Sequence, residues 1–184
     1  MKAIDIEGEL RELVASEEVL AYFDFTLPLG GAADAAREVE GLCKVSRPRE
    51  RKSRSTYLSL FFIVDAPDDA TRRAIDTKLS RADWNECSAS TPGVDCVMAI
   101  PHRHAGAGLF LKEIDAYLDG SYPPTAAFVR DALLPAVARA TQLRPGELTI
   151  WEETAADPGG GAPRAAADAG ETLLSRLRRF TRGG

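Results

Sequence analysis

Residues 57–64 read YLSLFFIV, the most hydrophobic run in this chain of 184 residues. Apolar side chains occupy both alternation faces of this run, with Leu58, Leu60, Phe62 and Val64 on one and Phe61 and Ile63 on the other. Strands that are apolar on both sides are usually covered on both sides. The run therefore predicts a central β-strand with a covering layer on each face.

The segments around this strand predict an α+β fold. Residues 19–27 alternate as a strand, 32–42 have a helical composition, and 84–100 resemble a hairpin that turns at Thr91-Pro92-Gly93. Asp68 or Asp69 is the expected N-cap of a helix that ends near Arg81. The resulting order, βαββαβ, is that of a ferredoxin-like sheet.

Further elements flank this core in the sequence. Residues 4–14 predict a short amphipathic helix, 109–118 a second helix, and 147–151 a short strand. Thr125 is expected to cap another helix, which Pro135 must kink or replace with a new helix. These C-terminal helices are expected to cover the second face of the sheet, and a homodimer interface on that face is the alternative.

Composition predicts a bacterial protein of the reducing cytoplasm. The chain is 45% hydrophobic with a net charge of −5, and its three cysteines are too few for a disulfide scaffold. No apolar run reaches the roughly 20 residues of a membrane helix, so no transmembrane segment is expected. We predict one domain over residues 1–153, a flexible Gly/Ala/Pro linker over 154–171, and a cationic amphipathic segment over 172–184.

The segment KVSRPRERKSR, residues 44–54, holds six basic residues and one acid. Clustered arginines favour an anion-binding role, in which Arg47, Arg49, Arg51, Lys52 and Arg54 would bind an acidic partner, a small anion or RNA. The negative net charge and the lack of an RNP-type motif disfavour nucleic acid. The alternative interpretation is an edge strand or a hairpin arm, kept charged to prevent edge-to-edge pairing.

The only histidines, His102 and His104, lie in PHRHAGAG, just before the predicted helix 109–118. A helix start flanked by glycines predicts a second anion site there, for a small ligand or a substrate. A zinc site with Cys87 and Cys96 is disfavoured because their spacing matches no common structural site. No P-loop, G-x-S-x-G or G-x-G-x-x-G motif occurs, so we predict no cofactor and name no catalytic residue.

The C-terminal segment TLLSRLRRFTR, residues 172–182, follows the predicted linker. Its apolar residues form one helical stripe, which predicts a peptide that folds on binding in a groove or on an anionic membrane. It resembles the C-terminal cargo-loading peptides of bacterial shell compartments over about ten residues. Packing of this segment on its own domain is the alternative. We expect a non-enzymatic adaptor that contacts a protein partner through Leu173, Leu174, Leu177, Arg178 and Phe180.

Overall fold

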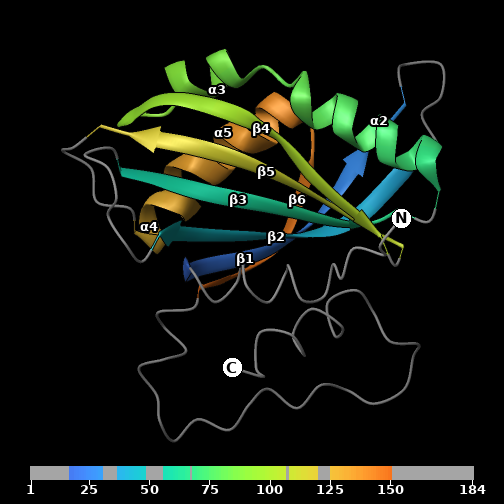
Figure 1. The fold of residues 1–184 in the computed structure, drawn as a ribbon. Helices are drawn as coiled ribbons and strands as arrows, with labels where there is room; N and C mark the ends of the chain where they lie inside the picture. Colours follow the sequence, from blue (N-terminus) through green and yellow to red (C-terminus); the bar gives the residue numbers. More distant parts are fainter. Residues whose placement is uncertain are drawn as a thin grey trace, which may run out of the picture.

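The computed structural model describes residues 17–30, 37–48, 56–66, 68–106, 108–119 and 125–150. Six strands form one antiparallel sheet in the order β4-β5-β3-β2-β1-β6 (Figure 1). Their bounds are β1 Glu17–Pro28, β2 Glu38–Pro48, β3 Thr56–Asp65, β4 Val94–Gly106, β5 Leu109–Leu118 and β6 Arg144–Ile150. The predicted central strand is β3, which pairs with β2 on one side and β5 on the other.

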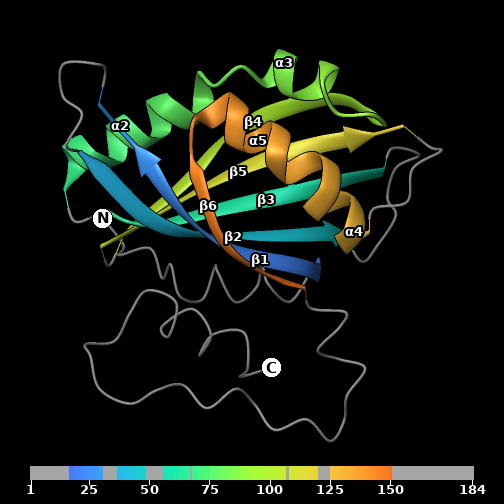
Figure 2. The ribbon, with the colours of Figure 1, turned by 180° about the vertical axis from the view of Figure 1, so that it is seen from behind.

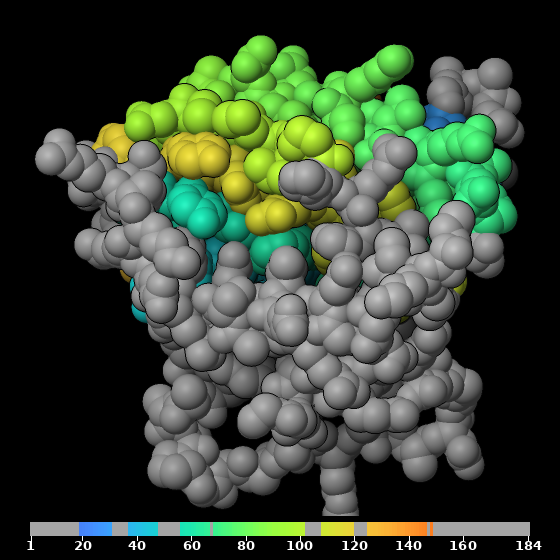
Figure 3. Space-filling view, viewed as in Figure 1, coloured from blue at the N-terminus to red at the C-terminus, as the bar shows by residue number. Residues whose placement is uncertain are grey.

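The described helices all pack on one side of this curved sheet, which we call the helix face (Figures 1 and 2). They are α2 Asp69–Ser80, α3 Trp84–Ala89, α4 Ala126–Phe128, the π-helical turn η1 Val129–Leu133, and α5 Leu134–Thr141. In the space-filling view, α2 and α3 form the upper side of the molecule, above β4 and β5 (Figure 3). The described fold is therefore a sheet with a single layer of helices.

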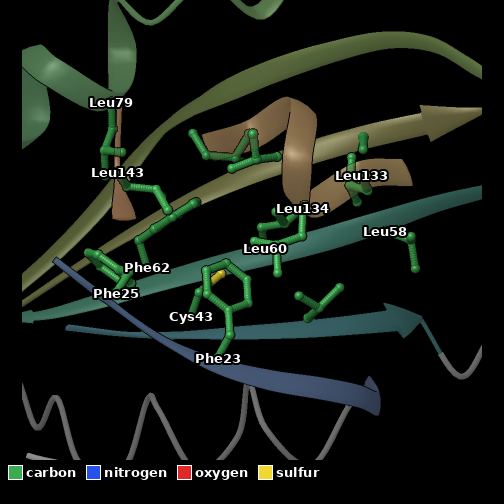
Figure 4. Packing of buried hydrophobic residues seen from close by; sticks show 14 of the residues in the cluster. Phe23, Phe25, Cys43, Leu58, Leu60, Phe62, Leu79, Leu133, Leu134 and Leu143 are labelled. Carbon is green, nitrogen blue, oxygen red and sulfur yellow. The ribbon is translucent and has the colours of Figure 1, made fainter. Parts of the chain in front are cut away.

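The main hydrophobic core fills the space between the helix face and the helices. Figure 4 shows Phe23, Cys43, Leu60 and Phe62 pointing from the strands toward residues such as Leu134 on the helices. Phe25 and Phe62 meet edge-on with ring centroids 5.4 Å apart. Each of these side chains is almost fully buried, and a buried aromatic or aliphatic side chain stabilises a fold by about 1.5–3 kcal/mol.

Helix α2 begins where its sequence predicted. The Asp68 carboxylate accepts a hydrogen bond of 2.7 Å from the Thr71 amide, so Asp68 is the N-cap. That bond holds the pKa of Asp68 below its ordinary value. Toward the sheet, α2 contributes Asp76, whose carboxylate lies 3.1 Å from the ammonium of Lys112 on β5. Lys112 is thus a buried cation on the helix face with a charged partner.

The C-terminal helical region confirms two local predictions. The Thr125 hydroxyl accepts a hydrogen bond from the Phe128 amide, which caps α4. Pro135 lies in the first turn of α5, directly after the π-helical turn η1. Proline lacks the amide that would bond one turn back, and the turn before it is widened to an i→i+5 pattern. Pro135 therefore begins a new helical segment, as predicted.

The predicted ferredoxin-like βαββαβ fold with extra C-terminal helices over the second face is wrong. Residues 38–42, predicted as part of a helix, belong to strand β2, and 109–118, also predicted as a helix, form strand β5. Residues 84–89, predicted as a hairpin arm, form helix α3, which Asp83 caps. The C-terminal helices pack on the helix face beside α2 and α3 rather than on the second face.

The segment after residue 44 was predicted to be an edge strand or a hairpin arm, and the edge position is wrong for its described part, which pairs antiparallel with the next strand. Lys44 to Pro48 belong to β2, an interior strand that pairs with both β1 and β3. Gly41 permits this close packing, since a Cβ there would lie 2.5 Å from the Phe25 ring and 2.7 Å from the Ile63 carbonyl oxygen. Residues 49–55 lie outside the described ranges. No helix in the described residues is long and apolar enough to cross a membrane.

Candidate functional site

The second face of the sheet carries four of the buried polar or charged side chains in the described residues, Lys44, Ser46, Ser59 and Asp115. The strand registers place Lys44 of β2 opposite Phe61 of β3, and Phe61 opposite Glu113 of β5. In the next row, Ser46, Ser59 and Asp115 lie opposite one another in the same way. Directly paired residues of antiparallel strands share a face. We call these six residues, Lys44, Ser46, Ser59, Phe61, Glu113 and Asp115, the second-face band.

Lys44 is the central charge of the second-face band. Its side chain is only 2% exposed, and its ammonium lies 4.9 Å from the centroid of the Phe61 ring. A cation over an aromatic face is stabilised by about 2 kcal/mol when the contact is desolvated. That gain is smaller than the several kcal/mol that burying an ammonium costs. The Phe61 ring therefore accounts for only part of what stabilises the buried Lys44 ammonium.

Asp115 provides a buried carboxyl group two strands away from Lys44. Its carboxylate accepts a hydrogen bond of 2.9 Å from the Ser59 hydroxyl. Burial raises the pKa of Asp115, while the bonds with Ser59 and Glu113 act in the opposite direction. A hydrogen bond between two carboxyl groups requires one of them to hold a proton. Asp115 and Glu113 thus form a pair that binds a proton more readily than an isolated aspartate.

Aromatic and sulfur side chains continue the second face at one end of the band. Tyr57 and Tyr117 are cross-strand neighbours with ring centroids 5.6 Å apart. On β4, Cys96 lies opposite Tyr117 and Met98 opposite Asp115, and Met98 is 50% exposed. Cys96 lies in the apolar alternation Val94, Cys96, Met98 and Ile100, a pattern that by itself indicates a core position. An irregularity between Val94 and Cys96 shifts the register, so Cys96 is exposed.

Neither a metal site nor an activated buried thiol is present in the described part of the chain. The described residues include no cluster of three His, Cys, Asp or Glu side chains able to hold a metal ion. Cys43 and Cys87 are buried in the helix-face core, and burial raises the pKa of Cys87 to about 11, which disfavours a thiolate nucleophile. The second face instead carries a buried cation, a carboxyl pair and aromatic rings.

The predicted anion-binding residues are only partly described. Arg47 is half-buried on β2, whereas Arg49, Arg51, Lys52 and Arg54 lie outside the described residues. The backbones of His102 and His104 belong to strand β4, and β5 follows it. The helix start that the second anion site requires is therefore absent, because Leu109–Leu118 is a strand. The predicted partner-binding residues, Leu173, Leu174, Leu177, Arg178 and Phe180, lie outside the described ranges.

The carboxyl pair and its serine were not predicted from the sequence. Glu113 and Asp115 fall in the segment whose composition indicated a helix, where they would have been surface charges. The usable signal was the alternation over residues 109–118, in which Phe110, Ile114 and Ala116 take one face. Charged residues at alternate positions obscured that signal.

No protein-family model matches the chain, and no curated protein or solved structure is significantly similar to it. The functional argument therefore depends on the fold and the sequence of this chain alone.

Proposed function

We propose that this protein is a non-enzymatic adaptor whose C-terminal amphipathic segment, residues 172–182, docks on a protein partner. The observation that carries the proposal is the composition of the helix-face core. Residues between Leu20 and Leu143 build that core between the sheet and its helices. Because the described strands and helices pack on one another in this core, we infer that the apolar stripe of the C-terminal segment serves another surface.

The edges of the sheet support a partner contact through a separate segment. Edge strand β4 carries Pro101 and two register irregularities, and edge strand β6 carries Pro145 and Gly146. Proline and bulges blunt a strand edge against pairing with another chain. An added strand from a partner is therefore disfavoured at both edges, which leaves the tethered segment as the better contact.

The segment itself has the pattern of a helix that binds in a groove. Its four apolar residues are Leu173, Leu174, Leu177 and Phe180, and arginines occupy much of the remaining surface. An apolar groove with an acidic rim is the complementary surface. The predicted linker, residues 154–171, would let the segment reach such a groove while it remains joined to the domain.

A pull-down with matched variants tests this proposal. The bait is the full chain, compared with a chain ending at Glu153, with Leu177→Asp in the apolar stripe, and with Ser175→Asp on the opposite side of the helix. We expect truncation and Leu177→Asp to reduce partner recovery at least ten-fold, while Ser175→Asp retains it. Equal recovery by the truncated chain would contradict the proposal.

A further inference from the structure

The second face of the sheet is buried although the described helices all lie on the other face. Its apolar residues are separate from the helix-face core. Each is at most 6% exposed: Leu42 4%, Phe61 1%, Ile63 5%, Leu109 6% and Leu111 4%. Burial this deep on a face without a described helix indicates a further layer. We propose that residues 4–14 form that layer, as an amphipathic helix held over the second-face band.

The length and attachment of this segment fit the face. Eleven helical residues span about 16 Å, which is enough to cross four strands spaced about 4.8 Å apart. The segment joins β1 at Glu17, opposite Pro48 at one end of the sheet, and needs no linker to reach the face. Ile6, Leu10 and Leu13 follow one another at i, i+4 and i+7, which gives the helix an apolar stripe.

Direct attachment to β1, together with the buried Lys44, favours this segment over the C-terminal segment as the occupant. Residues 4–14 contain four acids and one arginine, whereas residues 172–182 contain four arginines. Lys44 is almost fully buried at the centre of the face, while Asp24 and Glu113 are half-buried toward its sides. Charge interactions strengthen as water is excluded. Lys44 is the most deeply buried charge of the face and favours an acid of the cover directly above it, while Asp24, Glu113 and Asp115 leave the face as a whole without an excess of positive charge.

This inference concerns a different segment from the proposed adaptor contact and does not depend on it. If residues 4–14 cover the second face, the C-terminal segment cannot pack on that apolar face of its own domain. The arginine-rich segment would then remain available to a partner.

Limited digestion of the full chain with trypsin tests the inference at Arg11, in the middle of the segment. Cleavage after Arg11 should be at least a hundred-fold slower in the full chain than in a synthetic peptide of residues 1–16. Cleavage after Arg176 should be as fast in the full chain as in a synthetic peptide of residues 172–182. Ile6→Asp, in the apolar stripe but away from the scissile bond, should restore rapid cleavage after Arg11. Ala15→Asp, off the stripe, should preserve protection.

A second set of variants tests the role of charge. Lys44→Glu should accelerate cleavage after Arg11 more than Lys44→Met, which keeps the side-chain volume without the charge. Circular dichroism melting identifies any variant that fails to fold. If Lys44→Glu does not fold, the rate of cleavage after Arg11 in Lys44→Met is compared with that in the unaltered chain. Rapid cleavage after Arg11 in the unaltered chain would overturn the inference. Slow cleavage after Arg176 would then point to the C-terminal segment as the cover, and a dimer in light scattering would point to a second copy of the chain. Loss of partner recovery with intact protection would instead concern the adaptor function alone.

Discussion

The ion pair between α2 and β5 gives the sharpest stability prediction. The Lys112 ammonium lies 3.1 Å from the Asp76 carboxylate, and the two side chains are 3% and 18% exposed. Asp76→Asn keeps the size of the side chain but leaves Lys112 as a buried cation without this carboxylate. Removing one partner of a buried ion pair costs about 3–5 kcal/mol. Because Asp76 is partly exposed, we expect Asp76→Asn to lower the free energy of unfolding by about 3 kcal/mol.

A double-mutant cycle isolates this contribution. In a Lys112→Met background the buried cation is absent, so Asp76→Asn should cost less than about 1 kcal/mol. Urea unfolding followed by circular dichroism measures each variant, with an unchanged m-value showing that the unfolding transition is comparable. An equal loss from Asp76→Asn in both backgrounds would refute the reasoning, because it would mean that Lys112 and Asp76 do not interact across the helix face.

Three further predictions concern a close approach, a buried acid and a helix cap. Gly41→Ala should lower the free energy of unfolding by about 1–3 kcal/mol in urea titrations, because the added Cβ meets the Phe25 ring and a neighbouring strand. Asp115 has a raised pKa in the folded state, so it favours folding at pH values below its unfolded pKa, and this contribution is lost as pH rises through the folded pKa. Asp115→Asn, which can still accept the hydrogen bond from the Ser59 hydroxyl, should therefore flatten the loss of stability that accompanies rising pH above the ordinary pKa of aspartate; an unchanged slope would assign the profile to other groups. Thr125→Ala should cost about 1 kcal/mol, and Thr125→Ser should restore most of it, as thermal melts can show.

Local signals in the sequence were sufficient where an element depends on its own residues. The apolar run at residues 57–64 lies within β3, and Asp68 caps α2 through the Thr71 amide. Thr125 and Pro135 likewise define the ends of helical segments. Caps and prolines act within one helical turn, so their consequences are visible in a short stretch of sequence.

Elements that depend on distant partners were assigned incorrectly. Residues 109–118 contain leucine, lysine, glutamate and alanine, which favour helices intrinsically. In the structure they pair with β3 and β4, and Lys112 gains Asp76 of α2 as its partner. Residues 38–42 were misassigned for the same reason, since their pairing with β1 and β3 outweighs their composition.

The second-face band could not be predicted without these pairings. Lys44, Phe61 and Glu113 come from three strands, and only the registers of β2, β3 and β5 bring them into one row. The sequence did predict that the central strand is apolar on both faces, with Phe61 and Ile63 on the second. It could not show that a lysine and a carboxyl pair share that face.

The pairing of β6 with β1 has a consequence for the order of folding. Ala21 lies opposite Ile150, so the last described strand completes the sheet against the first. A contact between residues so far apart in the chain closes late, because the intervening loop carries a large entropic cost. On the ribosome, β1, β2 and β3 emerge well before β6, and β1 presents an open edge during that interval. The open edge of β1 must therefore be kept from pairing with other chains until β6 is added, and this requirement ends once the sheet is complete.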